Sequence, residues 1–530
     1  MEIVRTFLEQ QLLLTLFLVI GLGYALGEIN VRGFALGVGA VLFVGLAVGA
    51  FAPKAAPPVL LQSVGLVLFF YGIGIQYGRQ FFAGLRSRAG LRQNGLALVG
   101  LLAGVLVVGA LIVGGLGVDY ASGLFAGGLV STGALQAALE ATGSTNPSIG
   151  YSVAYPFGVF GPILALYLAI QLIKPAILAP AGAAYTTLEL AVQRADVLGK
   201  TVGEVAQLLP PGVQIAALQR DGINTIPQLS TRLAAGDDVL VMGPTAAVEG
   251  ARLVFGPVMP ATIMGHPQGL EYLRVFVSRA SVAGRQIGEL RISETLNASV
   301  VNVRRGDAEL HARPDLVLET GDRVGLMTMH DNFPTVRAFF GNSIKGTAEV
   351  SYVSLGIGIV LGVLLGLVAV PIPGLGPIAL GLAGGPLLMA LVLGRLGRSG
   401  PLTWTLPPTA NLVLRTFGLT LFLAAVGMRS GEAFATTVQI QGIQLLLLGA
   451  MITLAVVVVT LLLGHFALRM PFDELLGVVA GVTGNPAILA FAAKSVPTDK
   501  PDLGYAITFP TMTIVKILLV QVLVAVLGAT

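Results

Sequence analysis

Ser131-Thr-Gly-Ala-Leu-Gln-Ala-Ala-Leu-Glu140 is a small, polar, glycine-containing break in an apolar segment, and Tyr155-Pro-Phe157 interrupts the next apolar segment. A similar pair stands near the other end of the chain, where Val482-Thr-Gly-Asn-Pro-Ala-Ile-Leu-Ala-Phe491 is followed by Phe509-Pro-Thr511. Interrupted membrane segments at corresponding places in two halves indicate the binding site of a secondary transporter. The sequence therefore predicts two repeated membrane halves that move a small solute.

The composition is that of a membrane protein. Of 530 residues, 55% are hydrophobic and 11% are charged. Residues 95–117 and 441–464 contain no charge, and each can cross about 30 Å of hydrocarbon. The net charge of +4 is modest and its arginines are scattered, so we expect no nucleic-acid partner. The absence of cysteine removes disulfides, thiolate metal sites and thiol nucleophiles.

Apolar spans follow the same order on both sides of a more polar centre. Each half has four spans, one interrupted segment and a last span. The first half has spans at about 11–27, 34–53, 58–78, 95–117 and 151–173, with the interrupted segment at 121–143. The second half has spans at about 352–370, 375–394, 409–428, 441–464 and 504–528, with the interrupted segment at 474–494. Each half then has five crossings if the broken segments are re-entrant hairpins.

Arginine at the span ends predicts the orientation. The loop 79–94 holds Arg79, Arg86, Arg88 and Arg92, and positive loops stay in the cytoplasm. This places the polar centre in the cytoplasm as well, and both chain termini outside it. Because five crossings are an odd number, the two halves enter the membrane with opposite topology. The predicted fold is a polytopic α-helical membrane protein with two inverted five-span repeats around a cytoplasmic α/β domain pair.

The polar centre is itself duplicated. Val197-Leu-Gly-Lys-Thr-Val-Gly-Glu-Val205 returns as Val282-Ala-Gly-Arg-Gln-Ile-Gly-Glu-Leu290, and Ala235-Gly-Asp-Asp-Val-Leu240 returns as Thr320-Gly-Asp-Arg-Val-Gly325. Each copy predicts a strand, a glycine turn, a short helix, a strand, and a Gly-Asp turn into a last strand.

These features together resemble the aspartate:alanine exchanger family, whose two membrane halves surround two RCK C-terminal (TrkA-C-like) modules. The resemblance covers nearly the whole chain and implies exchange of small carboxylates, such as aspartate, alanine or succinate, by a homodimer in the inner or plasma membrane. The resulting domains are residues 1–178, 179–262, 263–346 and 347–530. No Gly-x-Gly-x-x-Gly lobe precedes the modules, so we expect no nucleotide cofactor. A small regulatory ligand at the modules and a purely structural role both remain open.

The two breaks are the first candidate site. A helix that begins inside the membrane presents unpaired N–H groups and a partial positive charge, which suits a carboxylate. The alternative is that small residues only allow close helix packing. Matched breaks favour a site, and the candidate substrate contacts there are Ser131, Thr132, Gly133, Gln136, Thr483, Gly484, Asn485 and Pro486.

The last span of each half supplies the remaining candidates. Lys516 lies near the centre of the span 504–528, about 18 Å from either end. A lysine there costs about 2.5–3.5 kcal/mol on insertion, so it faces a cavity or a partner. We interpret it as a cationic ligand of a carboxylate, and a structural partner for a carbonyl or an acid is the alternative. Tyr155, Phe509 and Thr511 flank the matched prolines, where packing against the hairpins is the alternative.

Two arginines in the span 409–428 and at its end are assigned differently. Arg429 is a candidate gate or second cationic ligand, with an interfacial arginine as the alternative. Arg415 lies four to six residues inside the predicted cytoplasmic face, about 6–9 Å of helix. Its side chain is therefore expected to reach that interface rather than a site.

The sequence favours a carrier over other classes. No catalytic or metal-binding constellation is evident, so we expect neither an enzyme nor a bound metal. A Thr-Val-Gly-Tyr-Gly filter is also missing, which disfavours a potassium channel. The leading interpretation is an exchanger of small carboxylates that works by elevator-like alternating access, the last point by analogy with two-hairpin carriers. The alternative is a ligand-gated ion channel, or an ion-coupled carrier, regulated by the modules.

Overall fold

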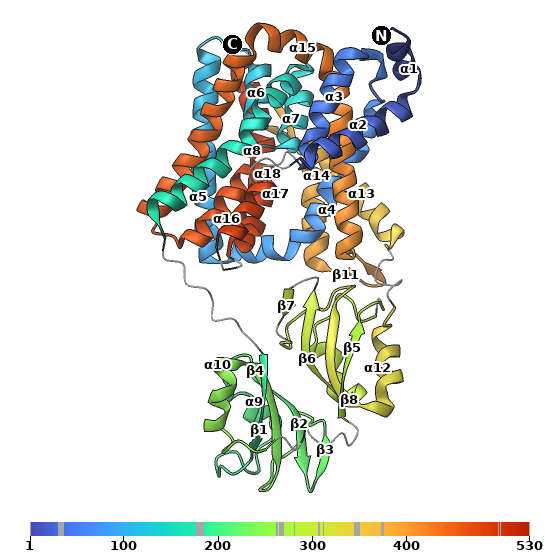
Figure 1. The fold of residues 1–530 in the computed structure, drawn as a ribbon, viewed down its shortest axis with the longest axis vertical. Coiled ribbons are helices and arrows are strands. Elements are labelled where there is room, and N and C mark those ends of the chain that lie inside the picture. Colours follow the sequence, from blue (N-terminus) through green and yellow to red (C-terminus); the bar gives the residue numbers. More distant parts are fainter. Residues whose placement is uncertain are drawn as a thin grey trace. The chain divides into compact units, whose positions relative to one another are not determined.

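The chain forms two units that are described separately (Figure 1). The computed structural model describes residues 2–29, 37–175, 185–260, 263, 270–279, 281–305, 308–310, 312–343, 350–372, 376–496, 498 and 500–528. A helical unit comprises Met1–Ala179, Tyr352–Leu396 and Asn411–Thr530, and a central unit comprises Pro180–Ser351 and Gly397–Ala410. The predicted domain boundaries at 178–179, 262 and 346–347 lie outside the described residues.

The helical unit has similar helices in its two halves. The first half contains α1 (Glu2–Gln10), α2 (Leu12–Gly27), α3 (Ala40–Phe51), α4 (Val59–Arg86), α5 (Arg88–Val113), α6 (Val118–Gly128), α7 (Thr132–Thr142) and α8 (Asn146–Ile173). The second contains α13 (Tyr352–Leu367), α14 (Gly381–Leu396), α15 (Pro408–Leu462), α16 (Phe472–Thr483), α17 (Pro486–Ser495) and α18 (Lys500–Leu527). Each predicted span contains a helix, but the spans 352–370 and 375–394 also reach into an antiparallel pair of short strands, β9 (Ala369–Ile372) and β10 (Gly376–Ala379). Pro371 and Pro377 lie in these strands, and proline does not continue a helix.

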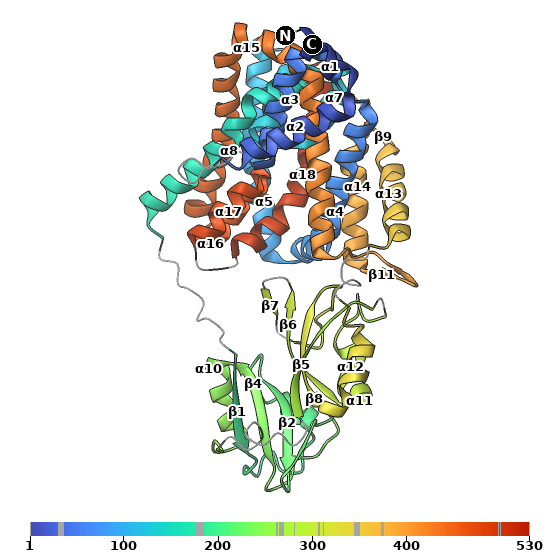
Figure 2. The ribbon, with the colours of Figure 1, turned by 45° about the vertical axis from the view of Figure 1, so that its right-hand side comes forward.

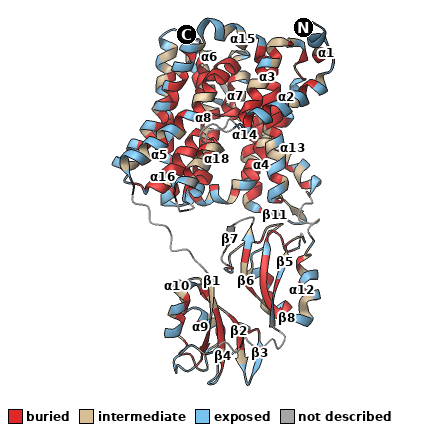
Figure 3. Ribbon diagram, viewed as in Figure 1, coloured by how far each residue is buried: buried red, intermediate tan, exposed pale blue. Residues whose placement is uncertain are grey.

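Several of these helices can cross a membrane. Among the described residues, five helices are long and apolar enough, and α1 with α2, bent by 105°, makes a sixth if the pair counts as one span. The outer faces of α5 and α13 are exposed and apolar, whereas buried positions gather inside the unit (Figure 3). This distribution is that of helices whose outer faces meet lipid.

The structure corrects two boundaries. The expected loop 79–94 is helical except at Ser87, because α4 continues to Arg86 and α5 begins at Arg88. The spans 409–428 and 441–464 were expected to be separate helices, but α15 runs through both without a break. Residues 429–440 contain no proline, so the backbone ladder continues across them. The two ends of α15 lie against different neighbours, α4 near Gly418 and α5 near Thr460, and Figure 1 shows the helix turning over between them.

Two long helices from different halves cross at a pair of glycines. A side-chain carbon on Gly65 of α4 would meet the Gly418 carbonyl and the Phe422 amide nitrogen of α15. One on Gly418 would meet the Gly65 carbonyl and the Phe69 amide nitrogen. Gly65 and Gly418 are 353 positions apart, as are Phe69 and Phe422, so each half presents the equivalent atoms to the other. A contact of this kind has local two-fold symmetry.

The helices that precede and follow each break also pack alike. In the first half, Gly123 of α6 lies against the backbone of Pro147 at the start of α8. In the second half, Gly477 of α16 lies against the backbone of Pro501 at the start of α18. The two pairs are 354 positions apart, and both glycines allow a helix-to-helix approach that a Cβ would block. The helix α4 packs against α18 and also against α14 (Figure 2).

The central unit contains two four-stranded sheets with the same strand order. The first has the order β1-β4-β2-β3 and the second the order β5-β8-β6-β7, all antiparallel. The strands are β1 (Tyr185–Ala191), β2 (Gln214–Arg220), β3 (Ile223–Thr225), β4 (Asp238–Pro244), β5 (Leu270–Phe276), β6 (Ala298–Arg305), β7 (Ala308–Leu310) and β8 (Arg323–Met329). The duplication expected from sequence is thus present as two similar sheets.

The turn that recurs in the two copies is followed by different short helices. Thr201 caps α9 (Val202–Ala206) through a capping box with Glu204. The second copy has a 3-10 turn (Gly288–Leu290) and α11 (Ile292–Leu296) in its place, and α12 (Phe333–Phe340) follows β8. The first copy instead has the short helix α10 (Thr245–Val248) after β4.

An arginine–aspartate pair recurs in both sheets. Arg220 donates two hydrogen bonds of 2.7 Å to Asp237, and Arg305 donates two of 2.8 Å to Asp322, 85 positions further on. Burial raises the pKa of Asp237, but hydrogen bonds from Arg220 and the Ala234 backbone outweigh it and hold that pKa below its ordinary value. The Gly-Asp turn seen in the sequence is therefore tied to the preceding hairpin by a charge-assisted pair.

Candidate functional site

The first break joins α6 to α7. Leu129 follows α6, and Val130 takes a left-handed conformation with φ of 47°. Ser131 then caps α7, because its Oγ accepts a hydrogen bond of 3.3 Å from the Ala134 backbone N–H. A valine in the left-handed region is uncommon and strained, so packing around the break holds it there.

The second break joins α16 to α17 in the same way. Gly484 takes the left-handed conformation with φ of 87°, and α17 begins at Pro486, as is favourable for a first helical residue. The Asn485 side chain caps the helix, because its Oδ1 accepts a hydrogen bond of 2.8 Å from the Ala487 backbone N–H. Ser131 and Asn485, 354 positions apart, are thus the equivalent N-caps.

The structure fixes the register between the two breaks. Both breaks contain a Thr-Gly pair, Thr132-Gly133 and Thr483-Gly484. Thr132 is the first residue of α7, however, whereas Thr483 is the last residue of α16. Each break has one left-handed residue followed by one capping side chain, so Val130 is equivalent to Gly484 and Ser131 to Asn485. This offset of 354 positions differs by three from the offset between the two Thr-Gly pairs.

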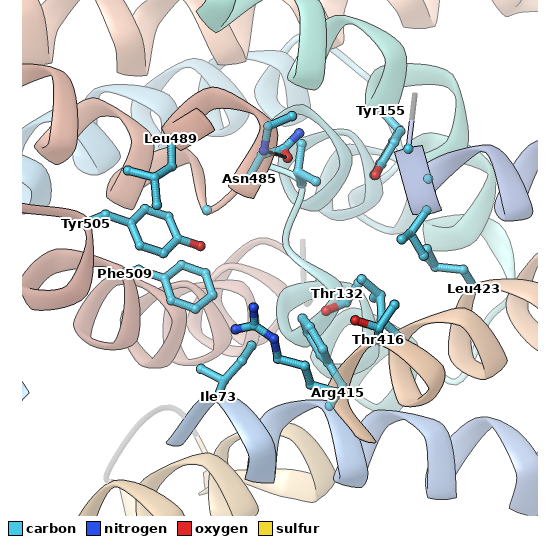
Figure 4. A pocket seen from close by; sticks show the side chains of 18 of the residues that line it. Ile73, Thr132, Tyr155, Arg415, Thr416, Leu423, Asn485, Leu489, Tyr505 and Phe509 are labelled. Atoms are coloured by element: carbon cyan, nitrogen blue, oxygen red, sulfur yellow. Dashed lines mark hydrogen bonds between the residues drawn. The ribbon is translucent and has the colours of Figure 1, made fainter. Parts of the chain in front are cut away.

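One cavity of about 380 Å³ lies beside both breaks (Figure 4). It is lined by α4, α8, α15 and α18 as well as by the starts of α7 and α17. The lining residues are Gly37, Val38, Gly39, Phe69, Ile73, Tyr77, Val130, Thr132, Tyr151, Tyr155, Arg415, Thr416, Leu419, Leu423, Gly484, Asn485, Ala487, Leu489, Tyr505 and Phe509. A mostly apolar wall with a few polar groups is typical of a small-molecule site.

The polar groups of the cavity come from both halves of the chain. Figure 4 shows Arg415, Thr132 and Asn485 around the same space. Arg415 is half-buried, and its Nη1 donates a hydrogen bond of 2.7 Å to Gln76 Oε1 of α4. The aromatic wall includes Tyr505 and Phe509, whose rings stack with centroids 4.9 Å apart. The site therefore offers a cation, a hydroxyl and an amide within an apolar enclosure.

Five of the residues predicted from sequence line this cavity: Thr132, Tyr155, Gly484, Asn485 and Phe509. Four others lie beside it and bond locally or pack. Gly133 packs against Phe70 and Ile517, and Gln136 bonds to Gln62 and Glu140. The hydroxyls of Thr483 and Thr511 each donate to a backbone carbonyl of the preceding helical turn. Together with the cap Ser131 and with Pro486, the first residue of α17, these residues shape the breaks.

Lys516 lies at the junction of the two breaks and is 1% exposed. Its Nζ donates hydrogen bonds to the Thr483 carbonyl at 3.2 Å and to the Leu129 carbonyl at 3.4 Å. These partners are the alternative that the sequence left open, a structural role towards carbonyls. A direct contact between Lys516 and a substrate stays a prediction.

The two arginines of α15 lie in different surroundings. Arg415 was expected to reach the interface, but it lines the cavity. Arg429 is exposed, and its Nη2 donates a hydrogen bond of 3.0 Å to the Pro57 carbonyl. The helix begins where it was expected, at Pro408, but the neighbouring α4 supplies a polar partner for Arg415, Gln76, inside the unit. A charge inside an apolar span is in itself a signal for a functional site.

The chain matches two known protein families. Residues 15–171 and 354–525 match the aspartate–alanine exchanger family described as "Predicted Permease Membrane Region", and residues 189–256 and 272–341 each match the TrkA-C domain. The membrane match covers more than half of the chain. The chain belongs to the aspartate:alanine exchanger family.

Relatives of this exchanger-family protein match it from end to end. An uncharacterized transporter of Geobacter sulfurreducens is 40% identical, over 97% of this chain and 98% of its own. One of Symbiobacterium thermophilum is 39% identical, over 97% and 98% respectively, and a putative transport protein of Edwardsiella ictaluri is 34% identical, over 96% and 97%. The exchanger-family protein is accordingly a multi-pass membrane transporter with two TrkA-C domains, and its relatives point away from an enzyme.

Among solved structures, the RCK domain of GsuK covers 32% of this chain and 65% of its own, at 13% identity and a TM-score of 0.16. A likeness of that size carries no argument. The assignment of the central unit rests on the TrkA-C matches and on the two sheets.

Proposed function

We propose that this protein is a secondary antiporter that exchanges small carboxylates, either aspartate for alanine or succinate-like dicarboxylates. The observation that carries the proposal is a cavity that lies beside both helix breaks and has Arg415 in its wall. The starts of α7 and α17 add partial positive charge on the same cavity. An arginine guanidinium binds a carboxylate through two parallel hydrogen bonds, which a mostly apolar enclosure strengthens.

A dicarboxylate fits this arrangement with its two ends held separately. One carboxylate accepts from the amide of Asn485 and the hydroxyl of Thr132, and the other pairs with Arg415. A monocarboxylate such as alanine uses one of these ends only. The aromatic rings of Tyr505 and Phe509 enclose the aliphatic part between them. Exchange of chemically related carboxylates at one site follows from such shared contacts.

The arrangement of helices supports an elevator-like movement. One wall of the cavity is formed by α4 and the first part of α15, which pack with α3 and α14. The opposite wall is formed by the breaks, α8 and α18, which pack with each other. Movement of the second group of helices along the first would carry the cavity across the membrane.

The same proposal includes the topology. The equivalent contacts of Gly65 with Gly418, and of Gly123 and Gly477 with their prolines, support two repeats related by a two-fold axis. We place that axis in the membrane plane, so that α6–α7 and α16–α17 are re-entrant hairpins of inverted repeats. The central unit is then cytoplasmic, the termini are outside, and the protein works as a homodimer in the cell membrane.

The TrkA-C modules are proposed to bind a small regulatory ligand on the cytoplasmic side. Deletion of residues 183–341 tests this role. If the modules regulate, transport by the deleted protein persists but no longer responds to cytoplasmic conditions. Complete loss of transport from a folded protein would instead assign them a structural role.

Counterflow in proteoliposomes tests the proposed function. Vesicles preloaded with aspartate, alanine or succinate are diluted into labelled substrate, and uptake is compared with that of empty vesicles. The proposal requires uptake that depends on an internal carboxylate. Uptake equal in loaded and empty vesicles would contradict exchange, and single-channel conductance in planar bilayers would favour the ligand-gated channel.

A further inference from the structure

We propose that the Lys516 ammonium takes the place of a coupling cation, so that this carrier exchanges carboxylates without Na⁺. The inference rests on the proposed function and adds to it the identity of the cation at the site. It is carried by the position of Lys516 between two helix ends that come from different halves of the chain.

The two carbonyls that Lys516 contacts are equivalent atoms. Leu129 immediately follows α6 and Thr483 ends α16, and they are 354 positions apart, as are the caps Ser131 and Asn485. Lys516 Nζ donates to both carbonyls, at 3.4 and 3.2 Å. One side chain of the second half therefore serves both breaks at once.

A cation is needed at this junction for electrostatic reasons. The C-terminal end of a helix carries a partial negative charge, of about half an elementary charge, on carbonyls without intrahelical partners. Two such ends, those of α6 and α16, meet at Lys516. In carriers with broken helices, the C-terminal ends and unwound carbonyls coordinate Na⁺, while the N-terminal ends bind anionic substrate groups. Here the N-terminal ends of α7 and α17 lie on the cavity, and the C-terminal ends hold Lys516.

The space around the ammonium is matched to it. Lys516 is 1% exposed, and its Nζ lies 3.2 Å from the position that a side-chain carbon on Gly484 would take. Gly484 is left-handed, so the break provides both the turn and the room for the amine. Lys516 is not among the residues that line the cavity. The cation is therefore tethered to α18 behind the substrate site and does not exchange with solution.

Removal of the side chain should create a site for an external cation. Lys516→Ala leaves two carbonyls and a space that Na⁺ or ethylammonium can enter. Lys516→Met is the matched control, because its thioether fills most of that space and brings no charge. Wild type should exchange carboxylates equally in Na⁺ and in choline buffers. Lys516→Ala should lose at least 10-fold in choline and recover with ethylammonium or Na⁺, and Lys516→Met should not recover.

A second measurement keeps the inference testable without transport. Ligands that bind only the folded state raise the unfolding temperature. Ethylammonium or Na⁺ should therefore stabilise purified Lys516→Ala, and should not stabilise wild type or Lys516→Met. This result would support the inference even if wild-type vesicles showed no carboxylate counterflow, an outcome that would contradict only the proposed function. A wild-type requirement for Na⁺, or full Lys516→Ala exchange in choline, would overturn the inference. So would the absence of stabilisation of Lys516→Ala by either cation.

Discussion

Gly65 of α4 and Gly418 of α15 lie against each other where the two helices cross. They occupy equivalent positions in the two halves of the chain. A Cβ on Gly418 would meet the Gly65 carbonyl, so Gly418→Ala forces the helices apart. We expect a loss of about 1–3 kcal/mol, as for other overpacked interiors. Thermal unfolding in detergent measures it.

The matched control for that substitution is Gly95→Ala on α5, where a Cβ would meet no atom within 4 Å. Alanine favours the helix there, so its stability should be equal to or slightly above that of wild type. Equal stability of both variants would contradict the close crossing.

The guanidinium of Arg415 should set the affinity for carboxylates. Arg415→Gln removes a charge-assisted contact worth about 1.5–3 kcal/mol, so the KM of counterflow should rise at least about 10-fold. Arg429→Gln is the control on the same helix, because Arg429 bonds to the Pro57 carbonyl away from the cavity. Its KM should stay within about twofold of wild type. A larger effect from Arg429→Gln than from Arg415→Gln would reverse our assignment of the two arginines.

The equivalent caps should differ in function although they share a structural role. Ser131→Ala and Asn485→Ala each remove a helix cap, which costs about 1 kcal/mol of stability. Only Asn485 lines the cavity, so only Asn485→Ala should also raise the KM for carboxylates. Thermal unfolding and counterflow on both variants separate the two effects. A similar KM for the two variants would remove Asn485 from the substrate site.

The Arg220–Asp237 pair should make the central unit sensitive to acid. The folded-state pKa of Asp237 lies below its ordinary value of 3.8. A carboxyl whose pKa is lowered by folding contributes stability above its unfolded pKa and loses it as the pH falls through its folded value. Asp237→Asn should therefore be less stable than wild type at pH 7, and the difference should shrink below about pH 4.

Fluorescence of Trp404 reports this difference, because it is the single tryptophan of the chain and belongs to the central unit. Asp315→Asn is the control, since both side chains of the Arg313–Asp315 pair are largely exposed. It should match wild type throughout. A stability difference for Asp237→Asn that is the same at pH 7 and pH 4 would exclude the ion pair as its source.

The order of the elements could be read from the sequence, and the contents of the cavity only in part. Apolar spans and the two Gly-Asp turns depend on local composition, so the helices and the duplicated sheets were expected where they occur. The register of the breaks depends on backbone conformation, and Val130 gives no sign of a left-handed residue. Arg415 was missed because its position depends on how α4 and α15 cross. Lys516 was singled out from sequence, but its partners, the Leu129 and Thr483 carbonyls, could not be named because they belong to distant parts of the chain.

Substrate protection of an introduced cysteine tests most directly whether the cavity beside the two breaks is the substrate site. The chain contains no cysteine, so single variants need no background correction. Thr416→Cys lies in the cavity wall, and Thr145→Cys is exposed before α8 and outside that wall. Both are labelled with a charged methanethiosulfonate reagent, with and without saturating aspartate or succinate. Our account predicts that these carboxylates slow labelling of Thr416→Cys at least about 10-fold and leave Thr145→Cys unchanged. Labelling of Thr416→Cys at the same rate with and without each carboxylate would contradict it.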